Sequence, residues 1–182
     1  MATWIALLRG VNVGGRQMVP MRDLVARLAD DGLTDVRSYL QSGNLVLRTA
    51  GGGARELGSR VRAVVRAGYG FEPRVLVLGV PELARAINAN PFPAAVDDAK
   101  AVHLYFLGET PKAPDLAALE RLRAGREAFA LAGKVFYLHA PDGFADSKLA
   151  ARAERFLGVD ATARNWRTAT TLLALARERA PS

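Results

Sequence analysis

The sequence predicts an α+β protein built from two tandem ferredoxin-like halves followed by a C-terminal helix. Two observations support this fold class. The first 80 residues contain six elements in the order strand, helix, strand, strand, helix, strand, which is the order of the split βαβ unit. The same order returns after residue 100, although the two halves share few residues at matching positions. The repeat is therefore predicted from element order alone.

The first half opens with a short apolar strand that ends in a glycine-rich turn. Pro20 then begins a helix whose apolar residues recur at helical spacing, and Gly32 ends it. Two strands of alternating character follow, with Ser42-Gly43 as a tight hairpin turn. The expected strands are 3–8, 35–40, 45–49 and 74–78, and the second expected helix is 54–67.

The second half begins after a connecting helix expected at 81–88. Ala132-Gly133 is expected to be the two-residue turn of its hairpin. The expected strands are 101–107, 127–131, 134–139 and 161–165, and the expected helices are 115–123, 147–157 and 168–179. The predicted domains are 1–80 for the first half, 81–100 for the connecting helix and linker, and 101–182 for the second half with its C-terminal helix.

The composition excludes several classes of site. Half of the 182 residues are hydrophobic and 24% are charged, which is typical of a globular protein with a packed core. The chain has no cysteine and only two histidines, so we expect no disulfide, no cysteine nucleophile, no metal site and no cofactor. The start has no signal-peptide pattern and no apolar run is long enough to span a membrane, which predicts a cytoplasmic protein. We expect it to be a monomer or a homodimer.

The net charge of +7 suggests an anionic partner, either nucleic acid or a phosphorylated small molecule. The excess lies in the first half, where 12 arginines up to Pro91 face seven acidic residues, a balance of +5. The chain is also rich in Ala, Gly and Arg, so a bias in codon usage explains the charge equally well.

The first candidate site is the loop RGVNVGGR after the first strand. Gly14 and Gly15 allow positive φ angles and close backbone approach, and Arg9 supplies positive charge beside the polar Asn12. This pattern predicts a cradle for an oxyanion, although it matches neither the Walker motif nor GxGxxG. A tight turn into the next helix explains the same residues.

The hairpin stretch QSGN is a possible second site, with Gln41, Ser42 and Asn44 as its polar residues. A hairpin turn alone also explains these residue types. We expect this turn at the opposite end of the sheet from the RGVNVGGR loop, so the two stretches need not share a pocket.

The stretch DGFADSK precedes a helix, with Asp146 as the expected N-cap and Ser147 and Lys148 after it. A lysine in the first helical turn opposes the helix dipole by about 0.3 to 1 kcal/mol, and a bound anion would remove this cost. The sequence therefore predicts a phosphate or carboxylate site here. A solvated lysine is the alternative.

The stretch TARNWRT places Arg164, Asn165 and Trp166 at one turn, with Thr168 as the expected N-cap of the last helix. Guanidinium, amide and indole groups together can hold a phosphate and stack a base. The alternative is a core tryptophan beside solvated arginines.

Neither histidine is assigned a catalytic role by its position, and the sequence assigns no reaction. His103 lies within an apolar strand and is expected to be a hydrogen-bonded core residue. His139, just before a loop, is the better candidate for proton transfer. Arg55, Arg62 and Arg66 form one stripe on a helix, which is an electrostatic track for nucleic acid or simply a solvated face.

Four stretches, ALLRGVNVGGR, SYLQSGNLVL, DGFADSKL and TARNWRT, resemble the bacterial family called domain of unknown function 1697. The resemblance implies a stand-alone protein with two ferredoxin-like lobes, and it implies no activity or catalytic residue. Arg16, Gln17 and Ala145 depart from the family pattern, and Ala145 makes its loop stiffer. The family motifs cover Arg9, Asn12, Gly14, Gly15, Ser42, Gly43, Asn44, Ser147, Lys148, Asn165, Trp166 and Thr168.

These observations lead to one functional hypothesis and two alternatives. The first is binding of a phosphate-bearing small molecule, with Arg9, Asn12, Lys148, Arg164 and Asn165 holding the charge and Trp166 forming a wall. The second is binding of nucleic acid by the basic face of the first half, and the third is a structural or dimeric interaction module.

Overall fold

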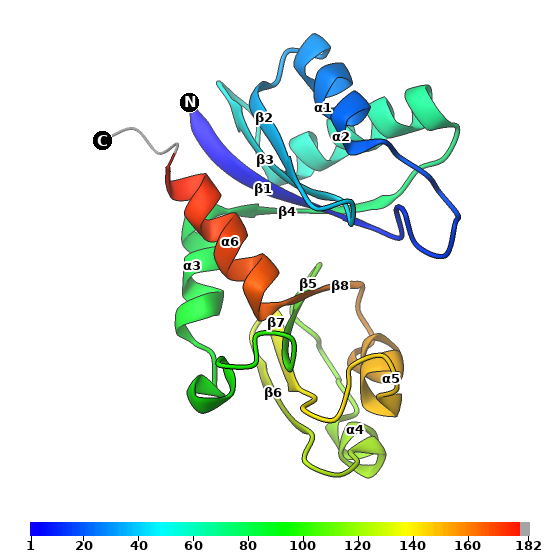
Figure 1. Cartoon of the computed structure of the whole chain (residues 1–182), viewed down its shortest axis with the longest axis vertical. Coiled ribbons are helices and arrows are strands. Elements are labelled where there is room, and N and C mark those ends of the chain that lie inside the picture. Colours follow the sequence, from blue (N-terminus) through cyan, green and yellow to red (C-terminus); the bar gives the residue numbers. More distant parts are fainter. Residues whose placement is uncertain (179–182) are drawn as a thin grey trace. The chain divides into compact units, whose positions relative to one another are not determined.

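The computed structural model describes residues 1–178 and divides the chain into two compact units. Unit 1 contains residues 1–84 and the chain from Thr171 onward, and unit 2 contains Arg85–Thr170. The chain passes between the units within α3 (Val80–Asn88) and again within α6 (Trp166–Arg177) (Figure 1).

Unit 1 is built on a four-stranded antiparallel sheet with the order β2-β3-β1-β4. Two helices lie side by side against it (Figure 1). In chain order the elements are β1 (Ala2–Arg9), α1 (Met21–Asp30), β2 (Thr34–Tyr39), β3 (Asn44–Thr49), α2 (Ala54–Tyr69) and β4 (Arg74–Gly79).

The core of unit 1 follows the helical periodicity of the sequence. Leu24 and Leu28 of α1 and Leu57 and Val61 of α2 are at most 2% exposed and pack with the apolar residues of one sheet face. On the other face of β1, Ile5 and Leu7 are buried as well. Both faces of the central strand are therefore inaccessible to solvent.

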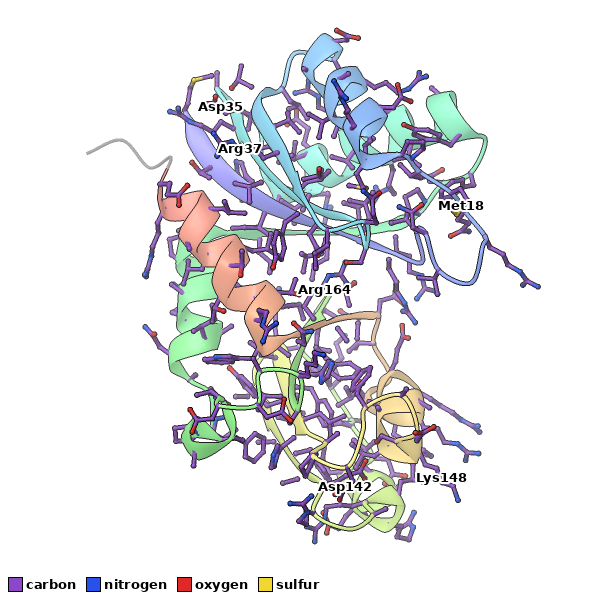
Figure 2. All side chains as sticks on the ribbon, viewed as in Figure 1. Met18, Asp35, Arg37, Asp142, Lys148 and Arg164 are labelled. Carbon is purple, nitrogen blue, oxygen red and sulfur yellow. The ribbon has the colours of Figure 1, made fainter. Side chains whose placement is uncertain are left out.

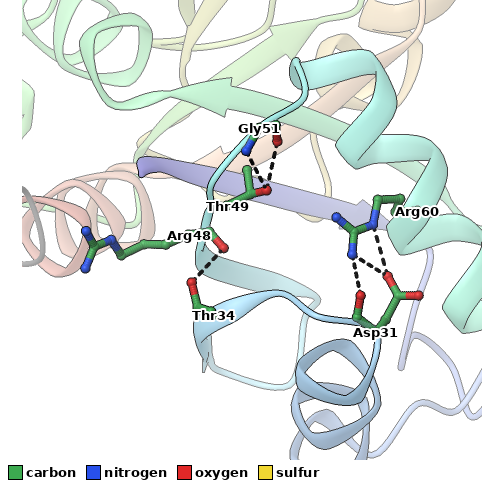
Figure 3. A network of polar contacts seen from close by, with 6 residues as sticks. All are labelled: Asp31, Thr34, Arg48, Thr49, Gly51 and Arg60. Atoms are coloured by element: carbon green, nitrogen blue, oxygen red, sulfur yellow. Dashed lines mark hydrogen bonds and ion pairs between the residues drawn. The ribbon is translucent and has the colours of Figure 1, made fainter.

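A polar network ties the elements of unit 1 together at its surface (Figure 3). Arg60 of α2 donates from Nε to the Asp31 carboxylate over 3.0 Å and from Nη2 to the Asp31 carbonyl at the end of α1. Thr34 donates to the Arg48 carbonyl over 3.2 Å, at the place where the pairing of β2 with β3 shifts register. These contacts fix α2 to the α1–β2 connection and close the outer edge of the β2–β3 pair.

Unit 2 repeats this plan with the sheet order β6-β7-β5-β8. Its elements are β5 (Val102–Leu107), α4 (Leu116–Leu122), β6 (Ala128–Ala132), β7 (Val135–His139), α5 (Lys148–Leu157) and β8 (Ala161–Asn165), preceded by the short helix η1 (Pro93–Ala95). All six residues of β5 are buried. Leu119, Leu149 and Leu157 of the two helices pack on the sheet.

The predicted fold class is confirmed: each unit has the βαββαβ order, and a C-terminal helix follows. Two hairpin turns were predicted wrongly. Ala132 pairs with Val135, so the turn residues are Gly133 and Lys134; Gly133 has φ +57°, as the first position of a type II′ turn requires. The β2–β3 loop runs from Leu40 to Gly43, because Leu40 already leaves the strand with φ +58°.

No helix within residues 1–178 is long and apolar enough to cross a membrane.

Candidate functional site

The glycine-rich loop of unit 1 folds into a small hairpin of its own. Val13 bridges Arg16, and the Asn12 N–H donates to the Gln17 carbonyl over 3.1 Å. Gly14 and Gly15 form the tip with φ +59° and +71°, the positive pair that a type I′ turn needs. A Cβ atom at either glycine would meet no heavy atom within 4 Å. The turn conformation alone accounts for both glycines.

Asn12 holds this loop in place through three hydrogen bonds. Its Oδ1 accepts from the Val19 N–H over 2.7 Å, and its Nδ2 donates to the carbonyls of Val19 and Gln41 over 2.8 and 2.6 Å. The side-chain amide of Asn12 thus makes its hydrogen bonds to backbone groups of unit 1. Its role in unit 1 is to join the β1–α1 loop to the β2–β3 hairpin.

The expected separation of the RGVNVGGR and QSGN stretches is wrong. The Leu8 N–H donates to the Gly43 carbonyl over 2.7 Å, and a Cβ atom at Gly43 would lie 2.5 Å from Cγ2 of Val11. The reason is strand direction. Because β1 and β2 are both antiparallel to β3, they run parallel to each other, and their C-terminal ends lie at the same end of the sheet. The loops that follow them therefore meet.

The polar residues of the hairpin also bond within it. Asn44 is fully buried and donates from Nδ2 to the Tyr39 carbonyl over 2.9 Å and to Ser42 Oγ over 3.0 Å. Gln41 contributes its backbone carbonyl to Asn12, and its side chain is exposed. Arg9 is partly buried at the end of β1. The structure of the hairpin turn therefore accounts for Ser42 and Asn44 of the second predicted site without a ligand.

In unit 2 the N-cap of α5 is Ser147, not Asp146 as predicted. Ser147 Oγ accepts from the Ala150 N–H over 2.9 Å, which satisfies one of the donors at the helix start. The sequence favours both residue types as caps, and only the position at which the loop enters the helix selects between them. Lys148 is the first helical residue, and its side chain is exposed on α5 (Figure 2).

The N-cap of α6 was also predicted one turn too late. Asn165 Oδ1 accepts from the Thr168 N–H over 2.8 Å, so Asn165 is the capping residue and Thr168 lies within the first turn. Trp166 begins the helix and is partly buried. Arg164, which precedes the cap (Figure 2), is partly buried, and this burial lowers the pKa of its guanidinium to about 10.

A pocket of about 410 Å³ lies in unit 2 beside the start of α6. We call it the lysine pocket. Its wall includes Asp98, Lys100, His103, Asn165 and the loop residues 143–145 that precede α5. Asn165 is thus the predicted site residue that this pocket contains.

His103 is the least expected member of the lysine pocket. It is 9% exposed and stacks on Phe144, with ring centroids 3.6 Å apart. Its Nδ1 is buried and has no hydrogen-bond partner among the described residues. The prediction of a core position is therefore correct, and the prediction that this nitrogen is hydrogen-bonded is wrong. Burial lowers the pKa of His103 to about 4, against a smaller raising effect of the Ala101 backbone. The imidazole is therefore neutral at pH 7.

A second pocket of about 480 Å³ adjoins the first, because both are lined by Asp98, Ala101 and Pro141. We call it the aspartate pocket. Its other charged or titratable residues are Asp97, Arg126 and His139. His139, the histidine that the sequence favoured for proton transfer, thus reaches a pocket, and its ring lies 5.7 Å from that of Phe92.

The charge of Arg126 in this second pocket is compensated within the protein. Its Nη2 lies 2.5 Å from Oδ1 of Asp142, and this contact lowers the pKa of the Asp142 carboxyl group (Figure 2 labels Asp142). Asp98 accepts the backbone N–H of Lys100 over 3.1 Å, which orders the loop before β5. Sequence reasoning missed this loop because 81–100 was treated as a linker; the charged run DDAK before a buried strand was the available signal.

The residues of the predicted single site fall in two units. Arg9, Asn12, Gly14 and Gly15 belong to unit 1, and Ser147, Lys148, Arg164, Asn165 and Trp166 belong to unit 2. Within unit 1 the structure joins the first group to the hairpin. Within unit 2 it places Asn165 in the lysine pocket.

The arginine stripe of α2 is partly compensated. Arg62 and Arg66 lie 3.4 and 3.7 Å from the carboxylate of Glu72, and Arg62 also donates to Ser59 Oγ over 2.8 Å. Ion pairs of this exposed kind weaken the local field without removing it.

Comparisons with known proteins agree with the fold. No curated protein matches the chain. One similar solved structure is the conserved bacterial protein SP0830 from Streptococcus pneumoniae, with 20% sequence identity, a TM-score of 0.72, and coverage of 96% of this chain and 98% of that chain. At this identity the likeness concerns the fold alone. The model of the family described as protein of unknown function, DUF1697, matches residues 1–137, and the chain therefore belongs to the DUF1697 family.

Proposed function

We propose that this protein binds a small phosphate-bearing molecule in the lysine pocket of unit 2. The observation that carries the proposal is the meeting, in one pocket, of an exposed lysine, the start of α6 and a buried histidine whose Nδ1 has no hydrogen-bond partner within residues 1–178. A volume of about 410 Å³ is in the range of small-molecule sites.

The electrostatics of the pocket favour an anion. Asn165 is both the N-cap of α6 and a wall residue, so the positive end of that helix dipole lies at the pocket. Residues 143–145 precede the N-cap of α5 by two to four positions. Lys100 adds a full positive charge, which the carboxylate of Asp98 in the same wall opposes.

His103 provides a neutral group that a phosphate ester can use. An uncharged imidazole has one donor and one acceptor nitrogen, and a buried polar atom without a partner is costly. Phe144 covers a face of this ring, so a ligand oxygen or hydroxyl would reach Nδ1 in the plane of the imidazole. A ligand is thus a natural partner for Nδ1.

Nucleic-acid binding is less well supported. Glu72 offsets the charge of two arginines of the α2 stripe in part. The central strands β1 and β5 are buried on both faces and so offer bases no stacking surface. A small molecule in a pocket requires neither feature.

The four lysines of the chain, at positions 100, 112, 134 and 148, allow a direct test. Reductive methylation with ¹³C gives each lysine a separate NMR signal that can be followed during titration with inorganic phosphate and ethyl phosphate. We expect the Lys100 signal to shift and saturate, while the signals of Lys112 and Lys134 stay unchanged. The Lys148 signal tests the prediction made from the sequence.

Variants complete this test. Lys100→Ala should weaken phosphate binding about fivefold or more, since it removes one charge-assisted contact. Lys112→Ala removes an exposed lysine outside the pocket and should leave the affinity unchanged. Equal shifts at all four lysines, or no saturable shift with either compound, would reject the proposal.

A further inference from the structure

The two adjoining pockets of unit 2 differ in charge. The lysine pocket has Lys100, the carboxylate of Asp98 and the start of α6, whereas the aspartate pocket has the carboxylates of both Asp97 and Asp98. Arg126 offsets these two carboxylates only in part, because its guanidinium also pairs with Asp142 at 2.5 Å. The pockets share the wall formed by Asp98, Ala101 and Pro141, so a single ligand can occupy both.

We infer that the ligand is bipolar: a phosphate ester whose phosphate lies in the lysine pocket and whose amino group lies in the aspartate pocket. This inference rests on the proposed function and narrows it to amino-bearing phosphate esters. Carboxylates such as those of Asp97 and Asp98 accept hydrogen bonds from an ammonium group, whereas Lys100 and Asn165 line the lysine pocket alone.

An organic cation fits the aspartate pocket better than a metal ion. Within residues 1–178, no three Asp, Glu or His side chains come together as a set of metal ligands. Hard cations such as Ca²⁺ need six to eight oxygen ligands, and Mg²⁺ needs octahedral geometry. An ammonium group needs only one or two carboxylates and leaves its remaining protons to water.

The unpartnered nitrogen of His103 is an observation independent of the charges. His103 is more than nine-tenths buried and lines the pocket next to Asn165, its neighbour in the pairing of β5 with β8. Its buried Nδ1 has no hydrogen-bond partner within residues 1–178, and a ligand in this pocket would remove the cost of that unsatisfied atom. The bipolar ligand therefore spans from this polar base of the lysine pocket to the exposed carboxylates of the loop before β5.

The test compares esters of equal length with and without an amine. The probes are 2-aminoethyl phosphate against ethyl phosphate and 3-aminopropyl phosphate against propyl phosphate, with affinities measured by calorimetry on the whole protein. We expect at least one amino ester to bind about fivefold more tightly than the ester of the same length without an amine, because a partly exposed ion pair contributes about this much.

The aspartates are tested by Asp97→Asn combined with Asp98→Asn, which keeps side-chain size and the Asp98 acceptor for the Lys100 N–H. The amine advantage should fall below about twofold in this variant. Glu109→Gln, an exposed carboxylate outside both pockets, is the matched control and should keep the full advantage.

The outcomes separate the two claims. If simple and amino esters bind equally well, or if the aspartate variant keeps the amine advantage, the bipolar inference is overturned and the phosphate site stands. If no ester binds and Lys100→Ala changes nothing, the proposed function fails and the inference fails with it.

Discussion

The side-chain amide of Asn12 donates a 2.6 Å hydrogen bond to the backbone carbonyl of Gln41, which joins two loops 29 residues apart in the sequence. Because the same amide group also bonds both backbone groups of Val19, it fixes three points of unit 1. The residue lies in the left-handed region with φ +56°, where asparagine is among the favoured residues. The position thus selects asparagine for both its backbone and its side chain.

Asn12→Ala should destabilise unit 1 by about 2 to 3 kcal/mol, since three hydrogen bonds are lost and a β-carbon without a polar group remains at positive φ. Urea denaturation measures this change. Asn12→Gly relieves the backbone strain and should cost less than Asn12→Ala. Equal stability of wild type and both variants would show that these bonds contribute little.

Gly43→Ala should cost more stability than Gly14→Ala, although both glycines have positive φ. A Cβ atom at Gly43 would lie 2.5 Å from Val11 Cγ2 and 2.8 Å from Leu8 Cβ, whereas one at Gly14 meets nothing. We expect about 1 kcal/mol for Gly14→Ala from backbone strain alone, and at least about 2 kcal/mol for Gly43→Ala. Thermal melting of the two variants compares them, and the reverse order would contradict the described packing.

Asn165 has a structural and a binding role that two substitutions can separate. Asn165→Ala removes the cap of α6 and should lower stability by about 1 kcal/mol as well as weaken phosphate binding. Asp caps helices as well as Asn does, so Asn165→Asp should keep the melting temperature. Its carboxylate should nevertheless repel a phosphate in the lysine pocket. A variant Asn165→Asp that binds phosphate as the wild type does would remove Asn165 from the site.

The protein should lose stability in acid through His103. The pKa of His103 is about 4 in the folded protein, and its ordinary value of 6.5 applies to the unfolded chain. Below pH 6.5 the unfolded chain therefore takes up a proton that the folded chain excludes. This contribution is complete above pH 6.5, falls as the pH decreases, and ends near pH 4. The total loss is about 3 kcal/mol.

The control for this prediction is His103→Leu, which cannot titrate. Denaturation at pH 7, 5.5 and 4.5 should give a smaller loss for this variant than for the wild type, because carboxylates titrate in both proteins and cancel in the comparison. His139→Gln should keep the wild-type dependence if His103 is the source. Parallel pH profiles for wild type and His103→Leu would contradict the assignment.

The order of the helices and strands, and nearly all of their positions, follow from local sequence patterns. Apolar periodicity marks the faces of α1, α2 and α5, and the strand that ends at Asn165 was predicted with the bounds that the structure gives. These features depend on residues close together in the chain. Local rules therefore suffice for them.

The caps and turns were less accurate because neighbouring residues compete for the same role. Asp146 and Ser147 are both good caps, as are Asn165 and Thr168, and their identity does not show which one meets the free N–H groups. The same ambiguity moved the β6–β7 turn by one residue, since both Gly133 and its neighbours fit a short loop. The choice depends on strand register, which is set by pairing across the sheet.

Which stretches of the chain meet depends on the packing of the folded units. The direction of β2 brings Gly43 against Leu8 and Val11, and the pairing of β5 with β8 brings His103 beside Asn165. Lys100 and Asp98 are identified as candidate site residues by the pockets that they line, and no sequence motif marks them. Contacts between residues distant in sequence arise from the summed packing of whole elements, and no local pattern records them.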